Sequence, residues 1–186
     1  MRIISGNLKG KKIFLPKDKK TRPLRDLVKE SIFNLIKHSN KFDCDIENSN
    51  ILDLFCGTGS FGLECISRNA KKVTFVENYR DALDILKKNI TSLKVDKKYE
   101  IFEEDCFNFF KLEKRFIKKF NLIFIDSPYQ EMNINSLIDE IKIKKVLDKN
   151  GILVIHRHKK DKVILSDKLK ILDERNYGIS KIIVGI

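Results

Sequence analysis

The stretch Ile51–Gly62, written ILDLFCGTGSFG, decides the fold of this chain. A mostly apolar run leads into three glycines spaced G-x-G-x-x-G, which predicts a buried strand, a sharp turn and the start of a helix. Glycines at such a turn let the backbone bend and approach a ligand, because no Cβ stands in the way. The stretch therefore predicts a ligand-binding loop at the end of a strand.

The chain beyond residue 50 alternates between the two kinds of element. Strands are predicted at 51–55, 73–77, 99–103, 121–126 and 151–156, and helices near 60–69, 80–93, 106–118 and 133–147. Such a series implies a parallel sheet with helices on both faces. The runs 168–174 and 180–186, separated by a turn at 175–178, predict a closing hairpin.

Residues 1–41 are strongly basic. They hold twelve Lys and Arg against three acids, a net charge of +9, whereas the other 145 residues carry only +3. A base-composition bias would scatter the lysines, but a segment that contacts phosphates concentrates them. Apolar runs at 2–5 and 11–15 predict a small hairpin, 24–38 predicts an amphipathic helix, and the polar 39–50 predicts a joint. A disordered basic arm is the alternative.

Bulk properties favour a cytoplasmic, single-domain protein of 186 residues. No apolar run approaches the roughly 18 residues of a membrane span, and no signal peptide is recognisable. The four cysteines are irregularly spaced, so they predict free thiols rather than a zinc site or disulfides. His156 and His158 alternate along a strand end and are expected to be surface histidines rather than metal ligands.

Two acids accompany the glycine loop. Glu77 ends the second predicted strand, 20 residues after Gly57, where a carboxylate binds the ribose hydroxyls of an adenosine-containing cofactor. The glycines alone fit NAD as well as S-adenosylmethionine (SAM). Asp53 favours SAM, which has a cationic methionine end and no phosphate. The alternative role of Asp53 is to accept hydrogen bonds from the loop's own N–H groups.

The third predicted strand is followed by a further acid, Asp105. Asp105 is expected either to accept the adenine amino hydrogens or to cap the next helix. The predicted cofactor-binding residues are Asp53, Phe55, Gly57, Thr58, Gly59, Glu77, Asn78, Asp105 and Cys106.

The fourth predicted strand delivers four candidate catalytic residues at its carboxyl end: Asp126, Ser127, Pro128 and Tyr129. An exocyclic amine of a nucleobase is a poor nucleophile, because its lone pair is delocalised into the ring. The Asp126 carboxylate and a main-chain carbonyl of the Ser127–Pro128 turn can accept its two N–H bonds, and Tyr129 can stack on the base. A plain turn is the alternative, but the glycine loop and Glu77 on neighbouring strand ends favour catalysis.

These motifs together resemble the RsmD-type bacterial methyltransferases, which modify guanine N2 in small-subunit (16S) ribosomal RNA. The similarity runs nearly end to end. LDLFCGTGSFGLECISRNA resembles the family's SAM loop and helix, including Glu64, Ser67 and Arg68, while ISGNLKGKKI, TRP and FNLI resemble its entry segment. Asn89 also fits the family pattern, with a structural role. Three residues depart from it: Ser127 replaces a proline, Leu24 a threonine and Asn69 a glycine.

The resemblance implies a Rossmann-like, class I SAM-dependent methyltransferase domain at 50–186, with a seven-stranded, mostly parallel sheet whose last strand is antiparallel. Residues 1–41 would be a basic extension for RNA recognition and not a separate domain. The target base would be splayed out of its stack to reach Asp126. The residues expected to hold phosphates are Lys9, Lys11, Lys12, Lys19, Lys20, Arg22 and Arg25.

The expected partner is ribosomal RNA or the small ribosomal subunit, bound by a monomer that needs neither a metal nor a membrane. Other planar amines, such as adenine N6 or a protein glutamine, are alternative substrates for the same pocket. A nonenzymatic RNA-binding assembly factor is the alternative from a different class, and an NAD oxidoreductase is a third.

Overall fold

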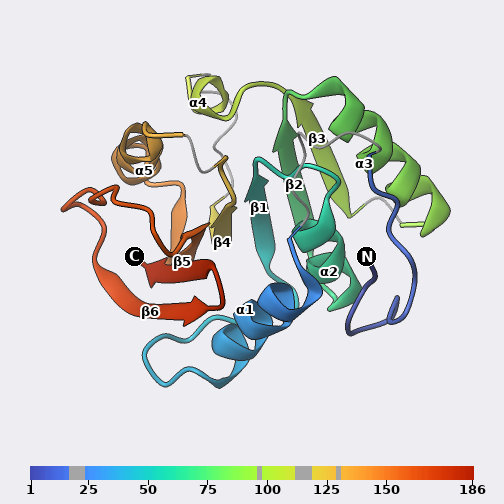
Figure 1. Cartoon of the computed structure of the whole chain (residues 1–186), viewed down its shortest axis with the longest axis horizontal. Helices are drawn as coiled ribbons and strands as arrows, with labels where there is room; N and C mark the ends of the chain where they lie inside the picture. The colour runs from blue at the N-terminus through green and yellow to red at the C-terminus, as the bar shows by residue number, and fades with distance from the viewer. Residues whose placement is uncertain (17–23, 96–97, 112–118, 129–130) are drawn as a thin grey trace.

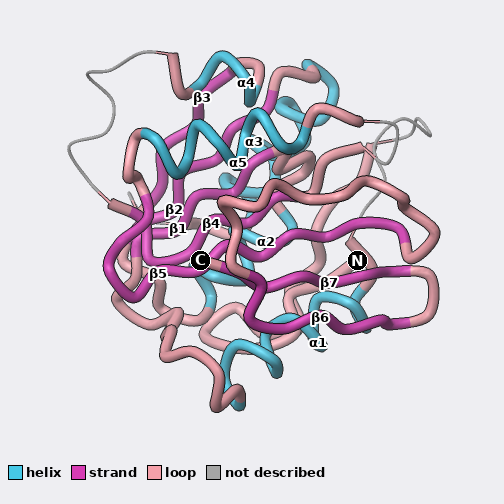
Figure 2. Tube along the Cα trace, turned by 90° about the vertical axis from the view of Figure 1, so that its left-hand side faces the viewer, coloured by secondary structure: helices cyan, strands magenta, loops and turns pink. Residues whose placement is uncertain are grey.

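One seven-stranded sheet organises the molecule, in the order β3-β2-β1-β4-β5-β7-β6. The computed structural model describes residues 1–16, 24–95, 98–111, 119–128 and 131–186. The strands are β1 (Asn50–Leu54), β2 (Lys72–Glu77), β3 (Tyr99–Glu103), β4 (Phe120–Ile125), β5 (Leu147–His158), β6 (Ile171–Tyr177) and β7 (Ser180–Gly185). Strands β1 to β5 pair in parallel, and β7 runs antiparallel to both β5 and β6. Figure 2 shows the strands as one continuous layer.

Helices cover both faces of the sheet (Figure 1). Successive strand residues face opposite sides, so Leu122 and Phe124 join one apolar cluster while Ile123 and Ile125 join the other. The first cluster includes α1 (Asp26–His38), α2 (Ser60–Ser67) and α3 (Arg80–Ser92), and the second includes α4 (Cys106–Phe109) and α5 (Ile134–Ile143). The predicted fold class, including the antiparallel last strand, is confirmed.

Four predicted boundaries differ from the structure. The helix expected at 133–147 ends at Ile143, because Lys145 has φ +49° and Val146 N–H bonds back to Ile141 O at 3.3 Å, a Schellman end. Strand β5 therefore begins at Leu147 rather than 151. The last hairpin turns at 178–179 rather than 175–178, with Gly178 at φ +61°. Helix α4 ends at Phe109, and residues 112–118 of its expected range lie outside the described part.

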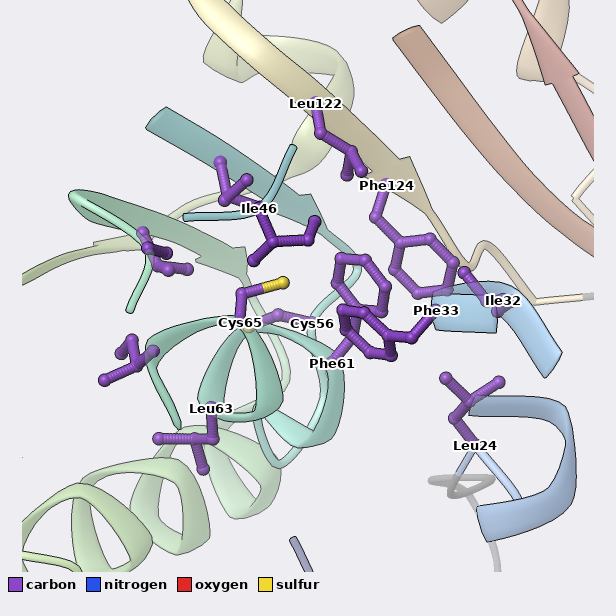
Figure 3. Packing of buried hydrophobic residues seen from close by; sticks show 14 of the residues in the cluster. Leu24, Ile32, Phe33, Ile46, Cys56, Phe61, Leu63, Cys65, Leu122 and Phe124 are labelled. Atoms are coloured by element: carbon purple, nitrogen blue, oxygen red, sulfur yellow. The ribbon is translucent and has the colours of Figure 1, made fainter. Parts of the chain in front are cut away.

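A stack of three aromatic rings fixes α1 to the rest of the fold (Figure 3). Phe61 of α2 lies between Phe33 of α1, at 5.1 Å between ring centroids, and Phe124 of β4, at 3.9 Å. Face-to-face contact of buried rings adds to the stabilisation from apolar burial. The stack holds α1 beside the glycine loop, so Leu24 and Arg25, just before α1, reach the site described below.

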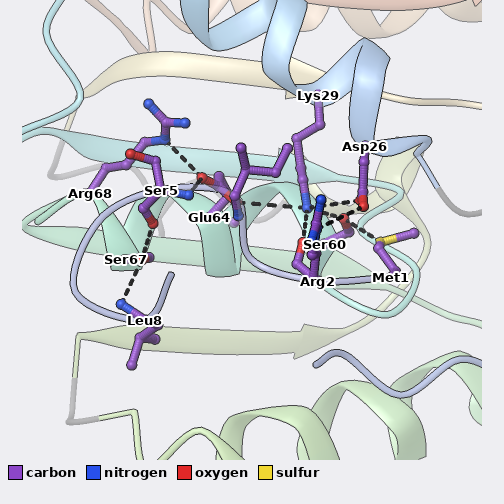
Figure 4. A network of polar contacts seen from close by, with 12 residues as sticks. Met1, Arg2, Ser5, Leu8, Asp26, Lys29, Ser60, Glu64, Ser67 and Arg68 are labelled. Atoms are coloured by element: carbon purple, nitrogen blue, oxygen red, sulfur yellow. Dashed lines mark hydrogen bonds and ion pairs between the residues drawn. The ribbon is translucent and has the colours of Figure 1, made fainter. Parts of the chain in front are cut away.

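The N-terminal residues form a hairpin that packs along α2 (Figure 4). Arg2 and Lys12 form an antiparallel bridge, and Ile3 and Ile13 are buried in the core. The N–H groups of residues 4 and 5 donate to the Glu64 carboxylate at 2.7 and 2.9 Å, and Leu8 N–H donates to Ser67 Oγ at 2.9 Å. A disordered arm is therefore the wrong interpretation for the hairpin within residues 1–16.

A buried ion pair joins the hairpin, α1 and α2 (Figure 4). The side chains of Lys29 and Glu64 are both 0% exposed, with Nζ and Oε2 3.7 Å apart. Lys29 Nζ also donates to Arg2 O at 2.8 Å, and Arg68 Nε donates to Glu64 Oε1 at 3.0 Å. Burial lowers the pKa of Lys29, against the raising effect of Glu64 and Asp26. Glu64 and Ser67, on which the family resemblance partly rests, thus bind the N-terminal hairpin to α2.

Two glycines of the hairpin provide a matched test of this docking. Gly6 and Gly10 have φ +78° and +81°, so an alanine is strained at both by about 1 kcal/mol or more. A Cβ at Gly6 would stand 1.8 Å from Ser67 O, whereas a Cβ at Gly10 meets nothing within 4 Å. We expect Gly6→Ala to lower the free energy of unfolding in urea clearly more than Gly10→Ala. Equal losses would show that the hairpin does not bear on α2.

Candidate active site

A cavity of about 880 Å³ opens at the carboxyl ends of the parallel strands. Its walls come from the ends of β1, β2, β4, β5 and β7 and from the segment before α1. It brings together most of the predicted site residues, namely Asp53, Phe55, Gly57, Thr58, Glu77, Asn78, Asp105, Asp126, Ser127, Pro128 and Arg25. Gly59 and Cys106 support this wall without lining it, and Tyr129 lies outside the described residues.

The glycine loop adopts a left-handed backbone at three positions, Phe55 (φ +55°), Gly57 (+54°) and Gly59 (+80°). Phe55 has a Cβ, so this conformation is costly there and has to be imposed by its surroundings. Its N–H donates to Cys106 Sγ at 3.2 Å, and its ring contacts the Phe107 ring edge-on at 5.9 Å between centroids. The rings of Phe55 and Phe107 therefore both line the cavity, as does Asp105. Phe107 is not among the residues predicted from the sequence.

Glu77 holds the loop while facing the cavity. Its Oε2 accepts Gly57 N–H at 2.9 Å, and its Oε1 accepts the N–H groups of Asn78 and Tyr79 at 3.0 and 2.9 Å. A carboxylate has about four acceptor positions, so one remains on Oε2 for a ribose hydroxyl. The ribose contact itself stays a prediction.

Asp105 has the capping role that was one of its two interpretations. Its Oδ1 accepts Phe107 N–H at 2.8 Å at the start of α4, and its Oδ2 accepts Asn78 Nδ2 at 3.2 Å. Asp105 also lines the cavity, so the cap leaves room for the adenine contact as well. That contact stays a prediction.

Asp53 is a buried acid at the floor of the cavity, 1% exposed. Burial raises its pKa well above the ordinary 3.8, as do the nearby charges of Asp126 and Glu77, against the Gly62 N–H that donates to Oδ2 at 2.9 Å. The described acids that line the cavity outnumber its one arginine, Arg25. A cationic ligand lowers the repulsion between these carboxylates, whereas a pyrophosphate increases the negative charge. The charge of the lining residues therefore fits SAM and not NAD.

We expect Asp53→Asn to stabilise the ligand-free protein and to weaken SAM binding roughly tenfold to a hundredfold. Between pH 3.8 and the raised pKa of Asp53, the folded state binds more protons than the unfolded state, so stability falls as pH rises. Asparagine does not titrate, and its stability advantage should grow across that window. Thermal unfolding at several pH values and calorimetric titration check both effects, with the exposed Asp84→Asn as control.

His156 corrects the expectation of a surface histidine. It is 6% exposed, and its Nδ1 lies 2.7 Å from Asp126 Oδ1 while its Nε2 lies 2.8 Å from Ser180 Oγ. A carboxylate accepts hydrogen bonds, so the geometry assigns a proton to Nδ1, and Nε2 pairs with the Ser180 hydroxyl. Ile125 pairs with Ile155 across β4 and β5, which places Asp126 beside His156 at the shared strand end.

Arg157 forms hydrogen bonds to Ser127 and Pro128, which follow Asp126 in the same turn. Its Nη1 donates to Ser127 Oγ at 2.8 Å and to Pro128 O at 3.1 Å, and its Nη2 donates to Glu131 O at 3.0 Å. Ser127 and Arg157 are both 2% exposed. The Ser127 hydroxyl, which a proline at this position would lack, thus has a buried hydrogen-bond partner, and Arg157 ties the turn to β5.

The predicted phosphate-binding residues divide into three groups. Arg25 lines the cavity, whereas Lys19, Lys20 and Arg22 lie outside the described residues. The turn that carries Lys9 packs at the far end of α2, where Asn7 N–H donates to Ser67 O at 2.8 Å. Lys12 instead forms an antiparallel bridge with Arg2, whose main-chain oxygen accepts from Lys29 beside Ser60 at the start of α2. Eight helical residues span about 12 Å, so the turn at Lys9 lies away from the cavity, whereas Lys12 lies on the strand that returns toward it. The contact of Lys9, Lys11 and Lys12 with RNA stays a prediction.

Other features of the described residues are plain. All four cysteines are free thiols. Residues 1–16, 24–95, 98–111, 119–128 and 131–186 contain neither a group of three His, Cys, Asp or Glu side chains that could hold a metal ion nor a helix long and apolar enough to cross a membrane.

Comparison with known proteins agrees with this geometry. Residues 1–186 match the family described as "Conserved hypothetical protein 95". Ribosomal RNA small subunit methyltransferase D of Buchnera aphidicola is 34% identical, over 88% of this chain and 81% of its own length. The protein of the same name from Haemophilus influenzae is 30% identical, over 96% and 90%. The solved structure of a candidate methylase from Haemophilus influenzae has a TM-score of 0.76 at 29% identity, covering 99% of this chain and 96% of that one.

The strand order, the antiparallel β7 and the acidic glycine-loop cavity define a Rossmann-like, class I SAM-dependent methyltransferase. Within that class, the match of the family to residues 1–186 identifies the family to which the chain belongs. The chain belongs to the "Conserved hypothetical protein 95" family, the RsmD family of methyltransferases.

Proposed function

We propose that this protein transfers a methyl group from SAM to the exocyclic N2 amine of a guanine in small-subunit ribosomal RNA. The observation that carries the proposal is the position of Asp126 in the same cavity as Asp53 and Glu77. The acceptor for an amine and the acids for a cationic cofactor thereby face one space. The names of the relatives support ribosomal RNA as the substrate, and the RsmD resemblance supports guanine N2.

The cofactor-binding half of the cavity follows from its charges. SAM, when bound, supplies an electrophilic methyl group on a sulfonium. Asp53 would face the cationic methionine end, Glu77 the ribose, and Asp105 with the rings of Phe55 and Phe107 the adenine. These roles combine the predicted contacts with side chains that line one cavity.

Asp126 would accept one N–H of the target amine and a main-chain carbonyl of the Ser127–Pro128 turn the other, which orients the nitrogen lone pair away from the ring. As the amine becomes cationic, the carboxylate stabilises the developing charge. His156 binds Oδ1, and among the described residues Oδ2 has no hydrogen-bond partner, so Oδ2 is the oxygen to face the amine. Tyr129 would stack on the base.

Mapping of methylated nucleosides tests the proposal. Small subunits from a strain that lacks the enzyme are incubated with the protein and SAM, and their RNA is digested and analysed by mass spectrometry. We expect one new N2-methylguanosine. Methylation of adenine or of a glutamine peptide, with none of subunit RNA, would replace the substrate, and SAM binding without any transfer would favour an assembly factor.

The proposal includes a monomer that acts in the cytoplasm without a metal. Size-exclusion chromatography with light scattering and activity after treatment with a chelator test these two points.

A further inference from the structure

A second basic segment lies at the same edge of the sheet as the cavity. Residues 157–162, RHKKDK, carry four basic residues and one acid, a net charge of +3. Residues 42–186 together also carry +3, so the rest of this region is neutral. Because β5 runs parallel to β4 and ends at His158, the segment leaves the sheet at the carboxyl edge.

The segment is joined to two walls of the cavity. Lys159 N–H donates to Ile179 O at 2.8 Å, and Ile179 lines the cavity mouth next to Ser180. On the other side, Arg157 binds the main chain of Pro128 and Glu131, which also line the cavity. The main chain that carries the three lysines is therefore anchored beside residues that line the cavity.

The charge of this segment resides on three exposed lysines. Asp161 forms an ion pair with the buried Arg157, and although burial raises the pKa of Asp161, the Val163 N–H and the Arg157 guanidinium bring it below the ordinary value. Asp161 thus stays charged and offsets Arg157. Lys159, Lys160 and Lys162 are exposed, and within the described part of the chain none of them has an ion-pair partner.

The backbone of the segment is held by its own hydrogen bonds. Asp161 N–H donates to His158 O at 2.9 Å, Lys160 N–H to His158 Nδ1 at 3.1 Å, and Val163 N–H to Asp161 Oδ1 at 2.9 Å. A turn ordered before binding loses little backbone entropy when it meets a ligand.

We propose that Lys159, Lys160 and Lys162 bind phosphates of the ribosomal RNA strand next to the flipped base. The inference rests on the proposed function and adds a contact surface outside the basic N-terminal segment. Lysines recognise phosphate as point charges and contribute a salt-dependent, sequence-independent affinity. The RNA would then contact these three lysines as well as Arg25, which lines the cavity.

The test replaces all three lysines by glutamine (K159Q/K160Q/K162Q). Its matched control is K142Q/K144Q/K145Q, which changes three lysines at the end of α5, on the opposite edge of the sheet. We expect the first variant to raise KM for small subunits roughly tenfold and to reduce the slope of log affinity against log salt by about two to three. SAM affinity, thermal unfolding and kcat at saturating subunit should not change, and the control should stay within about twofold of wild type.

The outcomes separate the two proposals. If wild type methylates subunits and both triple variants show the same KM and salt slope, this inference is overturned and the proposed function stands. If wild type methylates no subunit RNA, the proposed function fails and this inference fails with it. A lower SAM affinity in K159Q/K160Q/K162Q would also contradict the inference, since the effect would then lie on the cofactor.

Discussion

Replacing Asp126 by alanine is expected to lower kcat for subunit methylation by roughly 10² to 10³, the effect of removing one well-placed group that stabilises developing charge. The variant loses the partner of His156 Nδ1 and, in the mechanism proposed above, the acceptor for the amine N–H. SAM binding should persist, because Asp53 and Glu77 remain in place. Single-turnover transfer of a labelled methyl group measures the rate, and calorimetry measures the binding.

Two further variants sharpen this result. Asp126→Asn keeps one acceptor oxygen without the charge, so its rate should lie between those of wild type and Asp126→Ala. Asp84→Ala removes an exposed acid on α3 and should leave the rate unchanged. A wild-type rate for Asp126→Ala would remove this carboxylate from the mechanism.

Replacing Glu64 by alanine is expected to lower the free energy of unfolding by about 3 to 5 kcal/mol, because the buried Lys29 ammonium loses its counter-charge. The N–H groups of Ile4 and Ser5 and the Arg68 guanidinium also lose their acceptor. A domain of this size has about 5 to 15 kcal/mol in total, so the variant should be marginal at 37 °C. Urea unfolding measures the loss.

The control for Glu64 is an acid of an exposed pair. Glu100 binds Lys72 at the surface, and Glu100→Ala should cost less than about 1 kcal/mol. Glu64→Gln keeps an acceptor for the hairpin and should lose less than Glu64→Ala. If Glu64→Ala unfolds with the same free energy as Glu100→Ala, the pair does not hold the hairpin.

Local patterns were enough to predict the fold and much of the site. The loop at Ile51–Gly62 and the acids at strand ends are near one another in sequence or follow from the rule that parallel strands end at one edge. His156 and Arg157 could not be found in this way, because their roles depend on the register that pairs Ile125 with Ile155. A single sequence contains no signal for that pairing.

The N-terminal segment shows a second limit. Its net charge predicts an RNA-binding surface, yet the N–H groups of Ile4 and Ser5 and the buried Lys29 ammonium all contact the Glu64 carboxylate of α2. Glu64 and Ser67 were noticed only through the family resemblance. Their contacts join residues about 60 positions apart in the chain, a distance that periodicity does not bridge.

The place of β7 has a consequence for the newborn polypeptide. Although translated last of the seven, this strand inserts between β5 and β6 and brings Ser180 to the His156 ring. During synthesis on the ribosome the earlier parallel strands can assemble. His156, which contacts Asp126, lacks its partner Ser180 until β7 has emerged. The full set of contacts around Asp126 therefore forms only after β7 has been synthesised.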